Sequence, residues 1–199
     1  MRIIVVGASG DIGQAACRAL EGTHDLIRVG RSSGDITADM SDPRAVAEMY
    51  RQTGPVDAVV CTAGEVHFAL LLAQTHATMM EGLAQKTMGQ INLVLQGLTH
   101  VSDGGSFTLT SGILDRNPVR GGVGAATANG ALAGFVTGAA IEMPRRLRLN
   151  VVSPGMLDTS ARRYGALFPG HIPVPDHRVG QAYVKCVDGA MTGRVICVD

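Results

Sequence analysis

The chain has 199 residues, which is enough for one hydrophobic core and short for two domains. Hydrophobic residues make up 46% of it and the formal net charge is zero, which excludes a disordered chain and argues against nucleic acid as a partner. No apolar run approaches the ~20 residues that a bilayer requires, and no signal segment opens the chain. We therefore expect one domain over residues 1–199, in the cytoplasm and without a membrane partner.

The first strand and helix are predicted around a glycine-rich segment. Residues 2–6 are a short β-branched run, typical of a buried parallel strand. Segment 7–13, with three glycines, follows at once and leads into a predicted helix over residues 14–20. In this setting the glycines indicate a tight turn, a close backbone approach to a diphosphate, and close packing of helix on strand. We predict a dinucleotide site here, with an ordinary glycine turn as the alternative.

The second strand, residues 25–29, indicates which dinucleotide binds. NAD sites usually place a carboxylate after this strand, whereas an arginine accommodates the 2′-phosphate of NADP. Here Gly30 stands at the carboxylate position, and Arg31, Ser32 and Ser33 follow it. Arg31 can bind a phosphate through two N–H groups, so the sequence favours NADP over NAD. The alternative is a solvated loop arginine.

The remaining elements alternate between strands and helices, which predicts an α/β fold: a three-layer, doubly wound parallel sheet (Rossmann fold) as a single domain. Ligands bind such sheets beyond the carboxyl ends of the strands. The predicted elements are a strand at 36–39, a helix at 43–52 with Asp42 as N-cap and Pro43 at its first position, a strand at 56–61, a helix at 75–98, a strand at 106–110, a helix at 124–143 stopped by Pro144, a strand at 147–152, a loop at 154–175, a helix at 176–190 and a strand at 194–198.

Four further segments carry a known family pattern: Asp39, Thr-Ala-Gly at 62–64, residues 128–134, and residues 150–155 followed by Thr159. Together with the glycine turn they resemble the short-chain dehydrogenase/reductase family over nearly the whole chain. The glycine spacing is closer to that of the family's extended members. The resemblance implies that Asp39 contacts the adenine, that residues 150–155 hold the nicotinamide, and that Thr159 binds its carboxamide. The residues expected to bind the cofactor are Gly7, Ser9, Gly10, Asp11, Ile12, Gly13, Arg31, Ser32, Asp39, Thr62, Ala63, Gly64, Pro154, Gly155 and Thr159.

The chain departs from the family at the residues that carry its chemistry. The family uses a Tyr-x-x-x-Lys pair, a serine about 13 residues earlier and an asparagine on the long helix. In the register of this sequence the tyrosine position is Ala125 and the lysine position is Asn129, and neither can transfer a proton. Ser111 falls near the serine position, and the asparagine position holds Lys86.

Lys86 is one of only two lysines, against 15 arginines. A lysine at this position would direct an ammonium group toward the carbonyl oxygen that the missing pair serves. We expect Lys86 to supply the positive charge and the proton, with a pKa lowered by burial, and Ser111 to hydrogen-bond the carbonyl. The alternative is that Lys86 extends along its helix into solvent. His67 and Tyr164 are further candidates, each also compatible with a plain surface position.

The substrate side carries less signal. The loop at about 156–175 has an apolar lining with few charges, although Arg162 and Arg163 could face an acidic substrate or water. We expect a small, mostly apolar carbonyl or alcohol. The four cysteines lack CxxC spacing and indicate reduced thiols, and the histidines lack the spacing of metal ligands. The resemblance implies a homodimer or homotetramer formed through helices 75–98 and 124–143.

These observations predict an NADP-dependent oxidoreductase with an atypical active site, which transfers hydride between the nicotinamide and its substrate. The alternative is a non-catalytic NADP(H)-binding redox sensor or scaffold, which the missing Tyr and Lys favour. The retained nicotinamide-side residues favour the enzyme. A sugar-nucleotide epimerase is a third possibility, but such enzymes carry a larger C-terminal substrate region than this chain provides.

Overall fold

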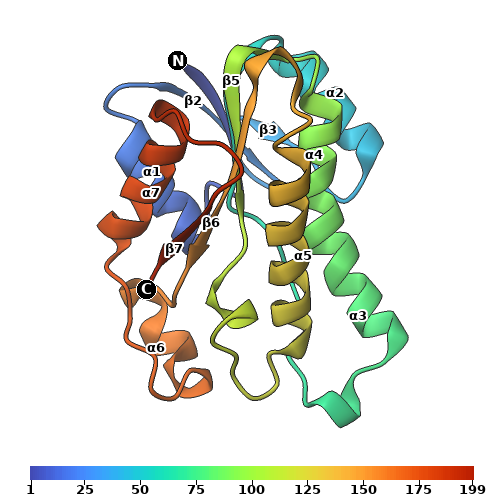
Figure 1. Cartoon of the computed structure of the whole chain (residues 1–199), viewed down its shortest axis with the longest axis vertical. Coiled ribbons are helices and arrows are strands. Elements are labelled where there is room, and N and C mark those ends of the chain that lie inside the picture. Colours follow the sequence, from blue (N-terminus) through green and yellow to red (C-terminus); the bar gives the residue numbers. More distant parts are fainter.

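The computed structural model describes residues 1–199 and contains one seven-stranded sheet, in which every strand is parallel to its neighbours (Figure 1). The strand order is β3-β2-β1-β4-β5-β6-β7. The order reverses beside β1, which pairs with β2 on one side and β4 on the other, so the crevice expected to bind ligands lies there. The strands are β1 (Arg2–Val6), β2 (Asp25–Gly30), β3 (Ile36–Thr37), β4 (Val56–Cys61), β5 (Val101–Thr110), β6 (Arg148–Pro154) and β7 (Val195–Val198).

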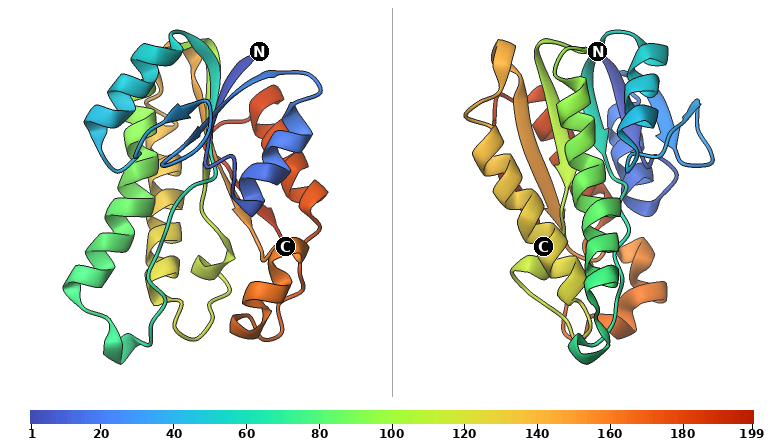
Figure 2. Two further views of the ribbon diagram at one scale, coloured as in Figure 1. Left: turned by 180° about the vertical axis from the view of Figure 1, so that it is seen from behind. Right: turned by 90° about the vertical axis from the view of Figure 1, so that its right-hand side faces the viewer.

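Helices cover both faces of the sheet, as predicted (Figure 2). Alternate residues of β1 divide between two hydrophobic cores, one on each face of the sheet: Ile3 and Val5 belong to one core, and Ile4 and Val6 belong to the other. This period-two alternation builds the three layers. One face carries α1 (Asp11–Leu20) and α7 (Asp176–Asp188), and the other carries α2 (Pro43–Thr53), α4 (Gly89–Gly97) and α5 (Val123–Ala139).

Local sequence signals predicted the start of α2 correctly and the start of α1 three residues too late. The carboxylate of Asp42 accepts a hydrogen bond from the backbone N–H of Arg44 at 2.8 Å, and Pro43 stands at the start of α2. This confirms the predicted N-cap. The first helix begins at Asp11, three residues before the predicted start, because the turn passes directly into the helix at the Gly10 N-cap.

The prediction of one regular helix over residues 75–98 was wrong. This stretch consists of α3 (His76–Gly82), a π-helical segment (Leu83–Met88) and α4. A π-helical turn contains more residues than an α-helical turn, so it changes the direction of the side chains that it carries. Lys86 lies within this segment.

Three other differences from the prediction exceed two residues. β5 begins at Val101, because that residue pairs with Val56 before a register shift, and the polar, glycine-rich stretch up to position 105 concealed it. α5 ends at Ala139 rather than Met143, and Pro144 begins a separate 3₁₀ turn. The predicted loop 154–175 contains the short helix α6 (Ala161–Tyr164).

No helix has the combination of length and apolar character needed to span a membrane. The four cysteines are all free thiols: Cys17, Cys61 and Cys186 are buried and Cys197 is exposed. No three histidine, cysteine or acidic side chains gather as a metal site would require.

Candidate active site

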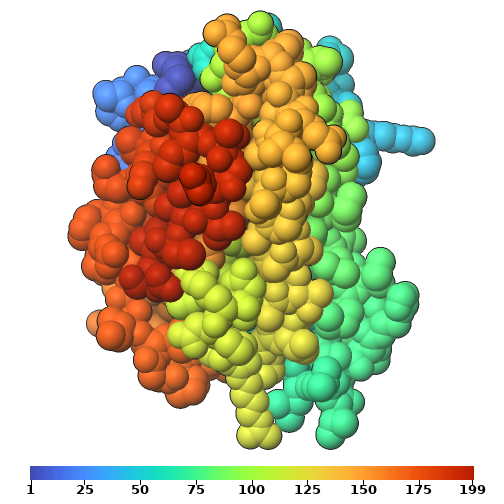
Figure 3. All heavy atoms as spheres, in the orientation of Figure 1, coloured from blue at the N-terminus to red at the C-terminus, as the bar shows by residue number.

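The carboxyl ends of the central strands surround a cavity of about 940 Å³, next to a smaller hollow of about 300 Å³. Both lie at the reversal of strand order, and Gly10, Arg31, Thr62 and Gly64 line both. At the lower end of the molecule in Figure 3, segments from distant parts of the sequence, coloured green, yellow-green and orange, form one surface. The topology therefore gathers most of the predicted cofactor residues around one cleft, although Gly13 and Thr159 line neither hollow.

The glycine turn is too tight for side chains at two positions. A Cβ on Gly7, whose φ is +83°, would lie 2.8 Å from the backbone nitrogen of Ala63, and a Cβ on Gly13 would lie 2.1 Å from the carbonyl oxygen of Gly7. The Thr62 hydroxyl braces the turn by donating to the carbonyl oxygens of Val6 at 3.0 Å and Gly7 at 3.1 Å. At the start of α1 no side chain caps the backbone N–H groups. This cradle fits the diphosphate of a dinucleotide.

The smaller hollow contains the residues predicted to select the cofactor. Ser9, Ser32 and Asp39 line it, together with Arg31. Hydrogen bonds from the side chain and backbone of Ser41 hold the pKa of the Asp39 carboxyl below its usual value. Arg31 forms an ion pair with Glu65 at 3.2 Å, and both side chains are more than half exposed. The sequence did not indicate this pair, because its members lie 34 residues apart.

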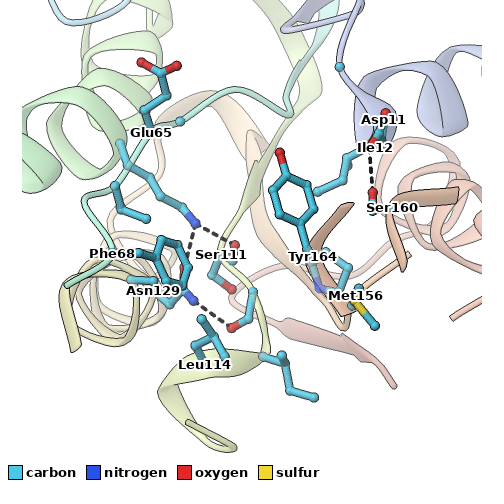
Figure 4. A pocket seen from close by; sticks show the side chains of 18 of the residues that line it. Asp11, Ile12, Glu65, Phe68, Ser111, Leu114, Asn129, Met156, Ser160 and Tyr164 are labelled. Carbon is cyan, nitrogen blue, oxygen red and sulfur yellow. Dashed lines mark hydrogen bonds between the residues drawn. The ribbon is translucent and has the colours of Figure 1, made fainter. Parts of the chain in front are cut away.

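The larger cavity brings Lys86 and Asn129 into direct contact. The Lys86 ammonium nitrogen donates to the Asn129 side-chain oxygen at 2.7 Å and to the Ser111 carbonyl oxygen at 2.9 Å. The Asn129 amide nitrogen in turn donates to the Gly112 carbonyl oxygen at 3.1 Å. Figure 4 shows these hydrogen bonds along one wall of the cavity. The Lys86 side chain therefore points into the cavity, as expected, and does not extend along its helix into solvent.

The stem of Lys86 reaches the cavity across Gly64. A Cβ at that glycine, whose φ is +154°, would lie 2.6 Å from the Lys86 Cγ. Burial lowers the pKa of Lys86 to about 8, and the Cys61 thiol and the Asp115 carboxylate only partly oppose this shift. Lys86 therefore changes protonation state close to neutral pH, where a proton donor is most effective.

Ser111 is positioned by its backbone and its side chain is left without a partner. Its N–H donates to the Val152 carbonyl oxygen at 2.9 Å, while its hydroxyl is buried and makes no hydrogen bond. Unpartnered buried hydroxyl groups are uncommon in folded proteins. Ser111 is one of the residues that line the cavity, so its hydroxyl is a candidate for contact with a bound ligand.

Two predicted cofactor residues, Asp11 and Thr159, are occupied by other contacts. Asp11 accepts a hydrogen bond from the Ser160 hydroxyl at 2.5 Å and pairs with Arg163, so its pKa lies below the usual value and the carboxyl is ionised. Thr159 is exposed, donates to Asp176 at 3.0 Å and does not line the cavity, whereas its neighbour Ser160 does. Sequence reasoning missed Ser160 and the pairing of Arg163 with Asp11, because these contacts span about 150 residues.

The tyrosine side chains and His67 are either exposed on the cavity wall or buried in the cores. Tyr164 and His67 line the cavity and are exposed, and Figure 4 shows Tyr164 across the cavity from Ser111 and Asn129. The other two tyrosines, Tyr50 and Tyr183, are completely buried in the two cores. The remaining cavity wall is largely apolar and includes Ala125, the residue that the sequence register assigned to the family's tyrosine position. The apolar side chains that line the cavity are Ile12, Val66, Phe68, Ile113, Leu114, Ala125, Met156, Leu157, Leu167 and Phe168.

Comparison with known proteins places this architecture in a family. Residues 2–172 match the family model described as Enoyl-(Acyl carrier protein) reductase. The chain is 28% identical over 167 residues to the uncharacterized oxidoreductase MT0954 of Mycobacterium tuberculosis, covering 78% of this chain and 62% of that protein. It thus spans less than two thirds of that relative's length.

Solved structures agree with this assignment. The Listeria innocua protein lin1944 is 43% identical, with a TM-score of 0.99 and complete coverage of both chains. A small-chain dehydrogenase in complex with NADPH is 25% identical, with a TM-score of 0.87 and coverage of 100% of this chain and 96% of that one. The chain belongs to the short-chain dehydrogenase/reductase family of oxidoreductases.

Proposed function

We propose that this protein is an NADP-dependent oxidoreductase that transfers hydride between the nicotinamide and a small, mostly apolar carbonyl or alcohol. One observation carries the proposal: the Lys86 ammonium lies in the cavity and donates to the Asn129 side-chain oxygen at 2.7 Å. In the register expected from the sequence, Asn129 stands at the family's lysine position and Lys86 at its asparagine position, so the two residues would have exchanged places. The exchange keeps an ammonium group in the cavity although the usual pair is missing.

The cofactor proposal rests on the cradle at residues 7–13 and on Arg31. The uncapped start of α1 would hold the diphosphate, and Arg31 would bind the 2′-phosphate beside Ser32. Pro154 and Gly155 line the larger cavity and would face the nicotinamide. Bound NADPH would supply the hydride. The NADPH complex of a related dehydrogenase favours the same cofactor here.

Lys86 supplies the proton in this proposal. Reduction of a carbonyl creates negative charge on its oxygen, which a positioned ammonium stabilises and protonates. The Ser111 hydroxyl, buried and without a partner, donates a second hydrogen bond to the same oxygen. Asn129 and the Ser111 carbonyl hold the ammonium in place. Each group thus has one task, and no tyrosine is required.

The cavity wall favours an apolar substrate. Phe68, Leu114, Met156 and Phe168 line the same cavity as Lys86, and Glu81 is a charged residue of that lining. Arg163, which could have attracted an acidic substrate, is paired with Asp11. A small aliphatic or aromatic aldehyde or ketone is therefore the proposed substrate class.

The direct test is oxidation of NADPH by the purified protein against a panel of aldehydes, ketones and quinones. We expect turnover with apolar aldehydes or ketones and slower turnover with NADH. Tight NADPH binding, measured by fluorescence in the same samples, with no turnover on any compound would favour the alternative of a non-catalytic NADP(H)-binding protein. That alternative rests on the expected sequence register, in which Ala125 stands at the family's tyrosine position.

The rate of carbonyl reduction should fall as pH rises through the pKa of Lys86, about 8. The protonated form is the proton donor; it is complete below this pKa and lost above it, by about tenfold per pH unit. Alcohol oxidation needs the neutral amine and should rise over the same range. The measurement is kcat as a function of pH for both reactions, and opposite pH dependences would agree with the proposal. If kcat changed with pH in the same direction for reduction and oxidation, the role of Lys86 would be contradicted. In Lys86→Arg, both pH dependences should become flat.

Arg31→Ala should weaken NADPH binding about fivefold to tenfold and leave NADH binding unchanged, since an exposed charged pair contributes on the order of 1 kcal/mol. Glu65→Gln should tighten NADPH binding, because it frees Arg31 from its ion pair. Arg44→Ala, at an exposed arginine outside both hollows, is the matched control. Titration of cofactor fluorescence measures all three. Equal losses for NADPH and NADH in Arg31→Ala would contradict the assignment to the 2′-phosphate.

A further inference from the structure

The nitrogen of Lys86 has two fixed hydrogen-bond acceptors and one direction left over. Its acceptors are the Ser111 carbonyl at 2.9 Å and the Asn129 side-chain oxygen at 2.7 Å. An ammonium group carries three N–H donors, whereas a neutral amine carries two. The two acceptors therefore satisfy the neutral amine completely and leave its lone pair in the third direction. No carboxylate forms an ion pair with this lysine, although nine ion pairs occur elsewhere in the chain.

The titratable groups around Lys86 do little to keep it charged. On β4, burial raises the pKa of the Cys61 thiol to about 12, so the thiol is neutral. Beyond β5, Asp115 already has Arg116 at 3.6 Å. α5 contributes the neutral amide of Asn129. The other titratable side chains of the cavity wall make no hydrogen bond to Lys86; they are Asp11, Arg31, Glu65, His67, Glu81 and Tyr164.

We propose that the neutral amine of Lys86 forms a reversible imine with an aldehyde or ketone that enters the cavity. The amine stands in a cavity with apolar walls, fixed by two acceptors and beside a hydroxyl without a partner. Desolvated lysines of this kind form Schiff bases with carbonyl compounds in proteins. The imine makes Lys86 a covalent binding site for apolar carbonyl compounds, in addition to its proposed task as proton donor.

The step balances without a further reagent. The Lys86 nitrogen attacks the carbonyl carbon, and one N–H hydrogen passes to the oxygen to give a carbinolamine. The C–O bond then breaks as the C=N bond forms, and the second N–H hydrogen leaves with the oxygen as water. Nothing is oxidised or reduced. The Ser111 hydroxyl donates a hydrogen bond to the departing oxygen, which is a use for a buried hydroxyl that otherwise has no partner.

The inference uses the same site as the proposed function but does not depend on it. Imine formation needs a carbonyl compound and no cofactor, so it can be measured in the full chain without added NADPH. A protein that never transfers hydride could still form the imine, and a reductase could lack it. The two proposals therefore fail separately.

The test is reductive alkylation at neutral pH with a small amount of hexanal and sodium cyanoborohydride, followed by peptide mass spectrometry. Lys185, the only other lysine, is exposed on α7 and serves as an internal reference. Lys86 should gain the hexyl group on the order of tenfold or more faster than Lys185, because each unit of lowered pKa raises the neutral fraction about tenfold. Equal or faster labelling of Lys185 would overturn the proposal.

Two variants test whether the labelling depends on the Lys86 amine and on the Ser111 hydroxyl. Lys86→Arg keeps a cation without a nucleophilic amine and should abolish labelling at position 86 without changing Lys185. Ser111→Ala should slow labelling of Lys86 several-fold. Hexanal labelled with ¹³C at its carbonyl carbon gives a second readout without reductant: an imine signal in the wild type that Lys86→Arg lacks. No imine signal together with no adduct at Lys86 would end the proposal.

Discussion

Lys86→Ala is expected to lower kcat for carbonyl reduction by about 10²- to 10⁴-fold, the usual contribution of a positioned general acid. NADPH binding should persist, because the glycine cradle and Arg31 are untouched. Lys185→Ala, at the exposed lysine on α7, is the matched control and should leave kcat unchanged. Steady-state kinetics and cofactor titration measure both effects. A kcat within about threefold of the wild type would remove Lys86 from the mechanism, since a lost general acid costs far more.

The exchange of lysine and asparagine allows a stricter version of this experiment. Lys86→Asn alone should behave like Lys86→Ala. Adding Asn129→Lys returns the lysine to the family's position, 2.7 Å across the same contact, and should recover at least part of kcat. Recovery would show that an ammonium in this corner of the cavity is what matters. Failure of the double variant, if it folds and binds NADPH, would show that the position of Lys86 on its π-helical segment is itself required.

Gly13→Ala is expected to abolish NADPH binding or weaken it by at least about 100-fold, because helix and turn must separate and the diphosphate cradle depends on their contact. A Cβ there would lie 2.1 Å from the Gly7 carbonyl oxygen, far inside van der Waals contact. The measurements are NADPH titration and the thermal unfolding midpoint. The midpoint should fall as well, because the clash involves backbone on both sides.

Gly22→Ala is the control for Gly13→Ala. Gly22 follows the other end of α1, and no atom lies within 4 Å of an added Cβ. This variant should bind NADPH as the wild type does and keep its stability within about 0.5 kcal/mol. Normal NADPH affinity in Gly13→Ala would contradict the assignment of residues 7–13 to the diphosphate.

The sequence predicted those parts of the fold that depend on neighbouring residues. The β-branched run at 2–6, the glycine turn and the Asp42–Pro43 helix start are all local patterns, and the structure confirms each element. The parallel direction of the strands followed from the alternation of strands and helices, whereas the structure supplied their order. Local chemistry and a simple topological rule were sufficient here.

The contacts that define the site could not be predicted in this way. The Lys86–Asn129 contact joins residues 43 positions apart, and only the family resemblance suggested a shared channel. The π-helical segment that carries Lys86 has no signal in apolar spacing, since it differs from an α-helix by about one residue per turn. The partners of Arg31 and Asp11 come from distant loops, and their charges alone do not specify which pairs form.

The most direct test of the central claim is transfer of deuterium from NADPH labelled at C4 of the nicotinamide to an apolar aldehyde. We predict that the wild-type protein produces an alcohol with deuterium on the former carbonyl carbon, and that Lys86→Ala produces far less under the same conditions. NADPH bound tightly by the wild type, with no deuterium in the product of any aldehyde or ketone of the panel, would contradict the claim that the protein is a reductase.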